Sequence, residues 1–284
     1  MSSVVDHSLC FPGSRTGFLL IHGLGGTPTE LRLVARALHA AGHTVHCPKL
    51  AGHCGSEDDL LATGWRDWAA SAEAALDRLR MDCDIVIVGG LSMGAVMAMH
   101  IAVERKADVQ GMALYAPTLW YDGWSIPWYS FLLKLLIDTP IGRRFRFVER
   151  EPYGVKDPRI RAIIVHAMGR GDSAEAGLLG TPSQSLREMW ALIARVKRTI
   201  GTIMQPALIA HARDDDIAGL ANAVYIQRNL GGLVDTVVMD DCYHLVTIDR
   251  QRDVVIDRSL ALARRLELAA ARAENGAAPA MAAE

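Results

Sequence analysis

Residues 84–104 read DIVIVGGLSMGAVMAMHIAVE, and this stretch decides the fold. Residues 84–88 (DIVIV) are a short apolar run, which is typical of a strand buried on both faces of a sheet. Residues 93–104 predict a helix. Between them, residues 90–94 (GLSMG) match the G-x-S-x-G pattern, in which a tight strand-to-helix turn exposes a serine hydroxyl. The stretch therefore predicts Ser92 as a nucleophile, and the alternative is a glycine-rich turn without a chemical role.

The same alternation of strands and helices continues on both sides of this stretch. Short apolar runs predict strands at residues 17–21, 43–47, 109–115, 206–210 and 234–239, and apolar residues at helical spacing predict helices at 28–41, 65–80, 220–230 and 253–266. Strands that alternate with helices in this way form a parallel sheet with helices on both faces. The sequence therefore predicts an α/β fold with a mostly parallel central sheet.

This alternation is interrupted once along the chain, between residues 117 and 202. Since the earlier pattern resumes afterwards, we expect residues 1–116 and 203–268 to form the core and residues 117–202 to be a cap insertion with a long helix at 185–199. A second small domain is the alternative. Residues 269–284 are rich in alanine without a usable apolar face, and we expect them to be disordered.

The overall composition argues against several classes of protein. The chain has 30 basic and 32 acidic residues, a formal net charge of −2, which gives no electrostatic reason to expect nucleic acid or an anionic membrane as a partner. Its five cysteines have no CxxC spacing and make a poor disulfide framework and a poor zinc site. No apolar run reaches the ~18 residues that span a bilayer, and the first residues do not resemble a secretory signal. We therefore expect a cytoplasmic protein without a metal, a cofactor or an integral membrane segment, and of undetermined oligomeric state.

A serine nucleophile needs a base, and it needs donors for the oxyanion of the tetrahedral intermediate. The glycine-rich residues 22–26 (HGLGG) directly follow the first buried strand and can turn their amides toward the edge of the sheet. The backbone N–H groups of Leu24 and of Met93, the residue after Ser92, are the expected oxyanion donors. A phosphate-binding loop is the alternative, although the sequence has neither G-x-G-x-x-G nor the lysine of a P-loop here.

His244 is the expected general base, because it follows the last predicted strand at the edge where the sites of open α/β sheets form. Around a G-x-S-x-G turn the chain order is serine, acid, histidine. The acid should therefore end the preceding strand, where three carboxylates, Asp214, Asp215 and Asp216, are adjacent. Periodicity does not choose between them, and a metal site or a solvated turn is the alternative interpretation of this acidic cluster.

Together with the serine motif, the stretches LLIHGLGGTPTELRLVARALHAAGHTVHCPKLAGHCGS, HARDDDIAGLANA and YHLVTIDR resemble bacterial carboxylesterases and monoacylglycerol lipases of the α/β-hydrolase superfamily. The resemblance covers residues 17–116 and 203–266, and the segment between them is only loosely similar to the small helical cap of that family. In the family, the acid follows an A-R-x-D pattern with an alanine eight residues later. This pattern implies Asp215, with Ala223 as the alanine, and leaves Asp214 as the runner-up.

The resemblance implies an α/β-hydrolase fold and a serine carboxylesterase or monoacylglycerol lipase. Such an enzyme acts on short- to medium-chain acyl esters as small-molecule substrates, through an acyl-enzyme on Ser92, without a metal or organic cofactor. It also implies Leu24 and Met93 as oxyanion donors. Two departures from the family pattern could reshape the pocket: Cys54 stands where glycine is usual, and Leu24 stands where phenylalanine is common.

The expected cap is rich in aromatic and apolar residues that suit an acyl chain. We expect four of them to bind substrate, namely Trp120, Trp124, Trp128 and Leu133. The alternative is that these side chains pack the cap against the sheet. Two other functions are compatible with the same residues: a thioesterase, acyltransferase or amidase with the same serine, histidine and aspartate, and a non-hydrolytic homologue that uses the pocket to bind a ligand.

Overall fold

The computed structural model describes residues 7–148, 150–169, 177–178 and 180–277. Its centre is a seven-stranded sheet with the strand order β1-β3-β2-β4-β5-β8-β9. The strands are β1 (Leu9–Phe11), β2 (Thr16–Ile21), β3 (Thr44–Cys47), β4 (Ile85–Leu91), β5 (Gly111–Tyr115), β8 (Ala207–Ala212) and β9 (Val234–Met239). Only β1 runs antiparallel to its neighbour, and the other five pairings are parallel. The mostly parallel α/β sheet predicted from the sequence is confirmed.

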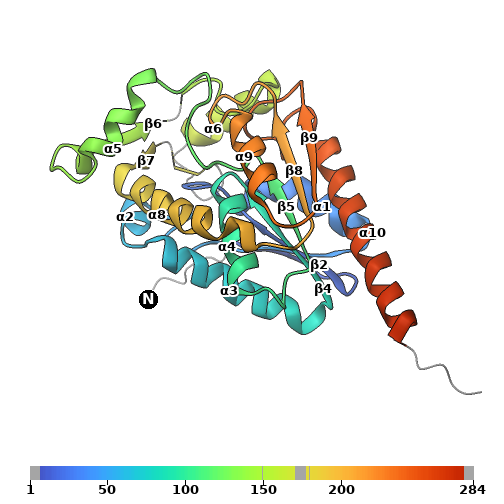
Figure 1. Ribbon diagram of the computed structural model, residues 1–284. Helices are drawn as coiled ribbons and strands as arrows, with labels where there is room; N and C mark the ends of the chain where they lie inside the picture. The colour runs from blue at the N-terminus through green and yellow to red at the C-terminus, as the bar shows by residue number, and fades with distance from the viewer. Residues whose placement is uncertain (1–6, 149, 170–176, 179, 278–284) are drawn as a thin grey trace, which may run out of the picture.

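Helices cover both faces of the sheet (Figure 1). The core elements are η1 (Pro28–Leu31), α1 (Arg32–Ala40), α2 (Glu57–Leu61), α3 (Trp65–Asp82), α4 (Met93–Glu104), α8 (Ser183–Thr199), η4 (Ile200–Thr202), α9 (Ala221–Asn229) and α10 (Arg252–Ala277). Successive residues of β2 point to opposite faces. Leu19 and Ile21 join the apolar cluster under α3, α4, α8 and α9, while Phe18 and Leu20 join the cluster under α1 and α10. Both faces of the sheet are therefore buried, as continuous apolar strands require.

The edge strand β1 did not emerge from the sequence pattern. It has three residues, and its register is defined by pairing of Leu9 with Cys47 and of Phe11 with Val45. A strand this short carries no periodic signal, so its existence depends on a partner that is distant in sequence.

The segment that leaves the core after β5 lies above the sheet at the upper left of Figure 1. It contains η2 (Trp128–Phe131), α5 (Leu132–Leu136), η3 (Gly142–Arg144), β6 (Arg146–Val148), α6 (Pro158–Gly169) and β7 (Gly180–Pro182), with β6 and β7 paired antiparallel. The expected insertion extended to residue 202. However, Met189, Leu192 and Val196 of α8 belong to the same apolar cluster as α3 and α4. Helix α8 is therefore part of the core, and the cap ends near β7.

Helix α10 is longer than the sequence led us to expect. Residues 269–277 were expected to be disordered, yet the helix continues to Ala277, and the rest of the expected tail, residues 278–284, lies outside the described residues. Residues 269–274 are alanine, arginine and glutamate, which are strong helix formers, so the helix persists without an apolar face to bury. Its last described turns project away from the sheet, as Figure 1 shows.

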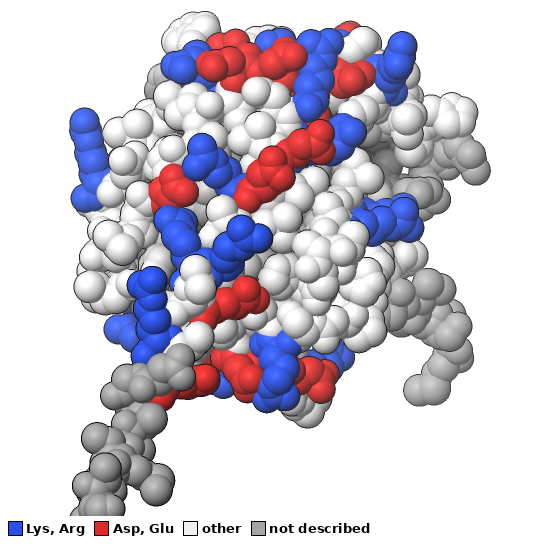
Figure 2. All heavy atoms as spheres, turned by 90° about the vertical axis from the view of Figure 1, so that its right-hand side faces the viewer, with Lys and Arg blue, Asp and Glu red and all other residues white. Residues whose placement is uncertain are grey.

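Charged side chains of both signs are interspersed on the face that α10 presents (Figure 2). Arg258 and Arg265 of this helix lie 4.0 and 3.6 Å from Asp235 of β9. Among the described helices, none combines the length and the apolar character needed to cross a membrane.

Candidate active site

Ser92 occupies a strained turn between β4 and α4. Its φ of +57° and ψ of −113° lie in a region that residues with a side chain rarely adopt. The turn is tight because both flanking glycines pack against the carbonyl oxygen of Ile21 on β2. A Cβ would come within 2.2 Å of that oxygen at Gly90 and within 1.9 Å at Gly94. The G-x-S-x-G pattern is therefore a steric requirement of this turn, which presents the serine at the carboxyl end of the sheet.

The Ser92 hydroxyl has a neighbour that sequence reasoning missed. Its Oγ lies 3.1 Å from Oγ1 of the buried Thr118, which donates to the carbonyl of Ala116 at 3.2 Å. Either hydroxyl can be the donor in this pair. None of the hydrogen bonds among the described residues joins Ser92 to His244. Proton transfer from Ser92 to His244 would therefore require the Ser92 hydroxyl to leave Thr118.

Asp215 and His244 form a buried pair, with exposed fractions of 2% and 6%. The imidazole Nδ1 lies 2.8 Å from Oδ2 and 3.0 Å from Oδ1 of the carboxylate. Oδ1 also accepts from the backbone N–H groups of Ile217 and Ala218, at 2.9 and 2.8 Å. Since Nδ1–H donates to the carboxylate, Nε2 is left as the atom that can take up a proton.

Electrostatics support this pair. Burial opposes the charge on Asp215, but the imidazole of His244 and the surrounding N–H groups outweigh it and lower the pKa of the carboxyl. The runner-up, Asp214, is exposed, and its backbone carbonyl accepts from the indole N–H of Trp124 at 3.0 Å. The adjacent carboxylates thus have different surroundings, and Asp215 is the one that contacts the imidazole.

The third carboxylate of the cluster, Asp216, binds backbone N–H groups of the histidine loop and of the cap, which the sequence did not reveal. Its side chain accepts from the backbone N–H of His244 at 3.2 Å and from that of Gly154 in the cap at 3.1 Å. Asp249 makes a similar link, because it accepts from the N–H groups of Tyr243 and Lys156, both at 2.8 Å. The two carboxylates hold the histidine loop against the cap segment that precedes α6.

The loop after β2 is ordered around the peptide that joins Gly23 to Leu24. The Gly23 carbonyl accepts from Gly26 N–H at 3.2 Å and from Nδ1 of His22 at 2.9 Å. Nε2 of His22 accepts from the N–H of Leu50 at 3.3 Å, so the proton is on Nδ1. Burial lowers the pKa of His22 to about 3, which keeps the ring neutral in this tautomer. With the carbonyl fixed on one side of a trans peptide, the Leu24 N–H points to the other side.

The second expected oxyanion donor lies at the start of a helix. Met93 is the first residue of α4, so its N–H has no carbonyl four residues earlier within the helix to which it could donate. The positive end of the helix dipole adds to the attraction for a negative charge at this position. A Cβ placed on Gly23 would lie 3.8 Å from the Ser92 Cβ, so the loop and the serine turn are adjacent.

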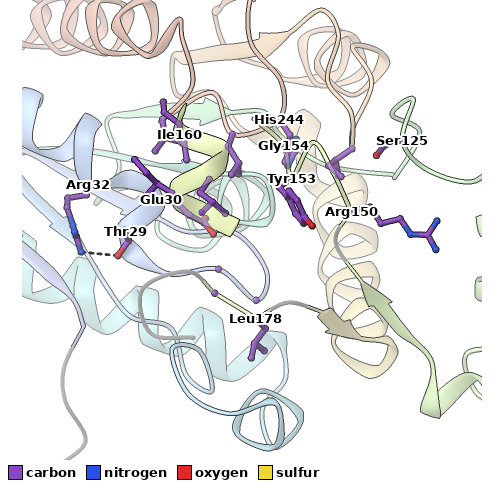
Figure 3. A pocket seen from close by; sticks show the side chains of 18 of the residues that line it. Thr29, Glu30, Arg32, Ser125, Arg150, Tyr153, Gly154, Ile160, Leu178 and His244 are labelled. Carbon is purple, nitrogen blue, oxygen red and sulfur yellow. Dashed lines mark hydrogen bonds between the residues drawn. The ribbon is translucent and has the colours of Figure 1, made fainter. Parts of the chain in front are cut away.

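His244 opens into a cavity of about 350 Å³ between the cap and the loop after β2 (Figure 3). Much of its wall is apolar and is formed by Leu33, Ile160, Ile163, Ile164, Leu178, Leu245 and Ile248. Polar lining comes from Glu30 beside the loop and from Tyr153 and Arg150 of the cap. An apolar cavity with a few polar groups suits a ligand with a hydrocarbon chain and one reactive polar centre.

The sequence model of the alpha/beta hydrolase family matches residues 18–258, which include most of the sheet, the serine turn and the Asp215–His244 pair. The chain belongs to the alpha/beta hydrolase family. Among curated relatives of this hydrolase, a thermostable monoacylglycerol lipase from Bacillus sp. (strain H-257) is 29% identical over 245 residues, which are 86% of this chain and 88% of the relative. A carboxylesterase from Bacillus subtilis (strain 168) is 22% identical over 260 residues, or 90% and 95% of the two chains.

Solved structures show the same fold. A structure of the metagenome-derived lipolytic enzymes LipS and LipT matches with a TM-score of 0.78 and 25% identity, covering 91% of this hydrolase and 97% of that chain. A soluble variant of monoglyceride lipase from Saccharomyces cerevisiae matches with a TM-score of 0.74 and 16% identity, covering 90% of each chain.

The four cap residues expected to bind substrate do not line the cavity of the hydrolase that contains His244. Trp120 and Leu133 line a separate hollow of about 130 Å³. Trp124 packs edge-on against Tyr243, with ring centroids 5.5 Å apart, and Trp128 is 84% exposed. The apolar wall of this cavity is formed by other residues, because these aromatic side chains pack elsewhere or are exposed.

The wall comes instead from α6, where Ile160, Ile163 and Ile164 recur at helical spacing. This periodicity is visible in the sequence and predicts an apolar helix face, but it does not say that the face lines the cavity.

The pH dependence of the hydrolase should report the charge balance around His244. Burial disfavours the imidazolium, but Asp215, followed by Asp216 and Glu30, outweighs it and raises the pKa of His244 above its ordinary value. Below that pKa the ring is protonated and cannot accept the Ser92 proton. We expect kcat/KM for a neutral ester to fall on the acid side with a midpoint above about pH 6.5. A midpoint clearly below that value would contradict the arrangement.

Proposed function

We propose that this protein is a serine carboxylic-ester hydrolase of the carboxylesterase or monoacylglycerol lipase type, with Ser92 as nucleophile, His244 as base and Asp215 as its orienting acid. The observations that carry the proposal are the buried Asp215–His244 pair, whose imidazole opens into an apolar cavity, and the strained Ser92 turn at the carboxyl end of the same sheet. The lipase and carboxylesterase among its relatives support the same class of reaction.

The reaction proceeds as two acyl transfers. Ser92 Oγ attacks the ester carbonyl while His244 Nε2 takes the hydroxyl proton, and Asp215 stabilises the resulting imidazolium. The N–H groups of Leu24 and Met93 bind the oxyanion, and a donor of this kind typically contributes ~3 kcal/mol to transition-state stabilisation. His244 then protonates the leaving alcohol. A water molecule repeats the sequence on the acyl-enzyme and releases the acid.

The cavity favours a single acyl chain of short to medium length. Its volume of about 350 Å³ lies at the small end of the range for ligand pockets, ~300–1,000 Å³, and its wall of leucine and isoleucine side chains suits a hydrocarbon. A small-molecule monoester fits this description better than a bulky triglyceride. The buried Cys47, Cys83 and Cys242 are thiols rather than disulfides, which supports a cytoplasmic location, where thiols stay reduced.

Two tryptophan substitutions on adjacent residues of α6 test where the acyl chain binds. Ile164 lines the cavity, whereas Val165 is exposed and does not. We expect Ile164→Trp to lower kcat/KM for p-nitrophenyl octanoate at least about tenfold, because the indole occupies space in the cavity. The kcat/KM for the acetate ester should stay nearly unchanged. Val165→Trp should behave like wild type with both esters.

The experiment is a panel of p-nitrophenyl acetate, octanoate and palmitate, extended to a thioester and an amide of octanoic acid. Wild-type turnover of the acetate and octanoate esters, faster than of the palmitate, thioester and amide, supports the proposal. Faster turnover of the thioester or the amide would indicate a thioesterase or an amidase instead of an ester hydrolase. Equal loss of octanoate activity in both tryptophan variants would place the acyl chain elsewhere.

A further inference from the structure

A carboxylate that the proposed mechanism does not use lies between the oxyanion loop and the histidine loop. Glu30 belongs to the short helix η1, directly after the glycine-rich loop. Its Oε2 accepts from the backbone N–H of Gly23 at 3.0 Å, and its carboxylate also accepts from the N–H of Thr27. The side chain therefore folds back and binds both ends of residues 23–27, the loop that carries Leu24.

The loop backbone is shaped around this carboxylate. A Cβ on Gly26 would lie 1.8 Å from Glu30 Oε1, so the side chain occupies the space where any larger residue at position 26 would be. Gly25 has a φ of +71°, a conformation that suits glycine. The loop contains three glycines, Gly23, Gly25 and Gly26, which make it intrinsically flexible. The two hydrogen bonds to Glu30 restrict it.

We propose that Glu30 is a positioning residue of the oxyanion hole, which holds the Leu24 N–H at the place where negative charge develops on the substrate carbonyl. The inference rests on the proposed function, since it assumes that Leu24 and Ser92 act in acyl transfer. Glu30 touches neither the serine nor, in the mechanism above, the reacting atoms. It acts through the backbone of Gly23 and Thr27.

Glu30 also links the oxyanion loop to the loop that carries His244. Its backbone carbonyl accepts from the hydroxyl of Thr247, three residues after His244, at 2.7 Å. Figure 3 shows the Glu30 side chain and His244 among the side chains that line the same cavity. Burial raises the pKa of Glu30, while the N–H groups of Gly23 and Thr27, followed by His244, favour its ionised form. Glu30 thus connects the donors of the oxyanion hole to the loop that carries the base.

Substituting Glu30 should affect the transition state more than substrate binding. Glu30→Met keeps the approximate length and removes both acceptors. We expect kcat for p-nitrophenyl octanoate to fall about 100-fold with KM within about twofold, because small displacements of a preorganised donor have effects of this size. Glu30→Gln retains one acceptor oxygen and should lose about tenfold. The matched control is Glu104→Gln, which alters a carboxylate that pairs with Arg195 on the helix face remote from the cavity.

Hydrogen exchange of the loop amides provides a measurement that does not depend on turnover. In wild type the N–H groups of Gly23 and Thr27 should exchange slowly, and in Glu30→Met at least about tenfold faster, with Glu104→Gln unchanged. Faster exchange together with a loss in kcat supports the proposal, and recovery in Glu30→Gln does so even if Glu30→Met unfolds.

Three results would overturn the role of Glu30: unchanged exchange, unchanged kcat, or a loss confined to KM. If wild type hydrolyses no ester while the exchange changes as expected, the proposed function fails and the hold of Glu30 on the loop remains. The two failures are therefore distinguishable.

Discussion

Ser92→Ala is expected to lower kcat for p-nitrophenyl octanoate about 10⁶-fold, which is the cost of removing the nucleophile from a serine–histidine–acid set. The change deletes one oxygen from a turn whose backbone is held by the packing of Gly90 and Gly94 against Ile21. It should therefore leave the fold intact, and relief of the φ of +57° is not expected, because alanine also carries a Cβ. The measurement is steady-state hydrolysis beside a thermal melt.

The matched control for this prediction is Ser14→Ala. Ser14 is exposed just before β2, at the amino end of the parallel sheet, and should retain full activity. An alkyl fluorophosphonate should add covalently to wild type and to Ser14→Ala but not to Ser92→Ala. If wild type and Ser92→Ala were equally inactive toward every ester and the fluorophosphonate labelled neither, a non-hydrolytic binding protein would become the better interpretation.

Asp215→Asn is expected to lower kcat about 10⁴-fold, while Asp214→Asn should stay within about threefold of wild type. An amide at position 215 can donate as well as accept, so it would favour the tautomer of His244 with the proton on Nε2, where the base must be free. It would also remove the charge that stabilises the imidazolium. Asp214 is exposed and contacts the rest of the site through its backbone, which the substitution preserves.

The two asparagine variants form a direct comparison because they make the same chemical change at neighbouring positions. The pH profile adds a second readout. Since Asp215 contributes more than any other group to raising the pKa of His244, the acid limb in Asp215→Asn should move to lower pH, and that in Asp214→Asn should not. Equal losses of kcat in both variants, or a larger loss at position 214, would contradict our proposal that Asp215 is the acid.

Much of the fold could be predicted from the sequence because local chemistry is sufficient for it. The apolar run before Ser92, the serine turn and the helix after it occur within one stretch of chain, and the structure has β4 and α4 there. The strand over residues 234–239 and the helix over 93–104 have the predicted bounds. A buried parallel strand is recognised as a short continuous apolar run and an amphipathic helix by its 3.6-residue period, so their alternation indicates the sheet without knowledge of contacts.

Part of the site could be predicted from the sequence for the same reason. Parallel strands end at a common edge, so residues just after β4, β8 and β9 were expected to meet there, and the structure brings Asp215 and His244 into contact. Periodicity could not distinguish Asp214, Asp215 and Asp216. Three adjacent side chains point in different directions, and burial decides which one faces the imidazole.

By itself, the sequence determined the strand–turn–helix that carries Ser92 and the α/β alternation around it, because these depend on residues close together in the chain. Tertiary packing decided the rest. It brought Asp215 into contact with His244 and placed Asp216 where it accepts from the backbone of the histidine loop. It also folded the Glu30 side chain back onto Gly23. It also made α6 rather than the aromatic segment the wall of the cavity. Such contacts join residues of different elements or loops, and their free energy depends on burial and geometry that no local pattern contains.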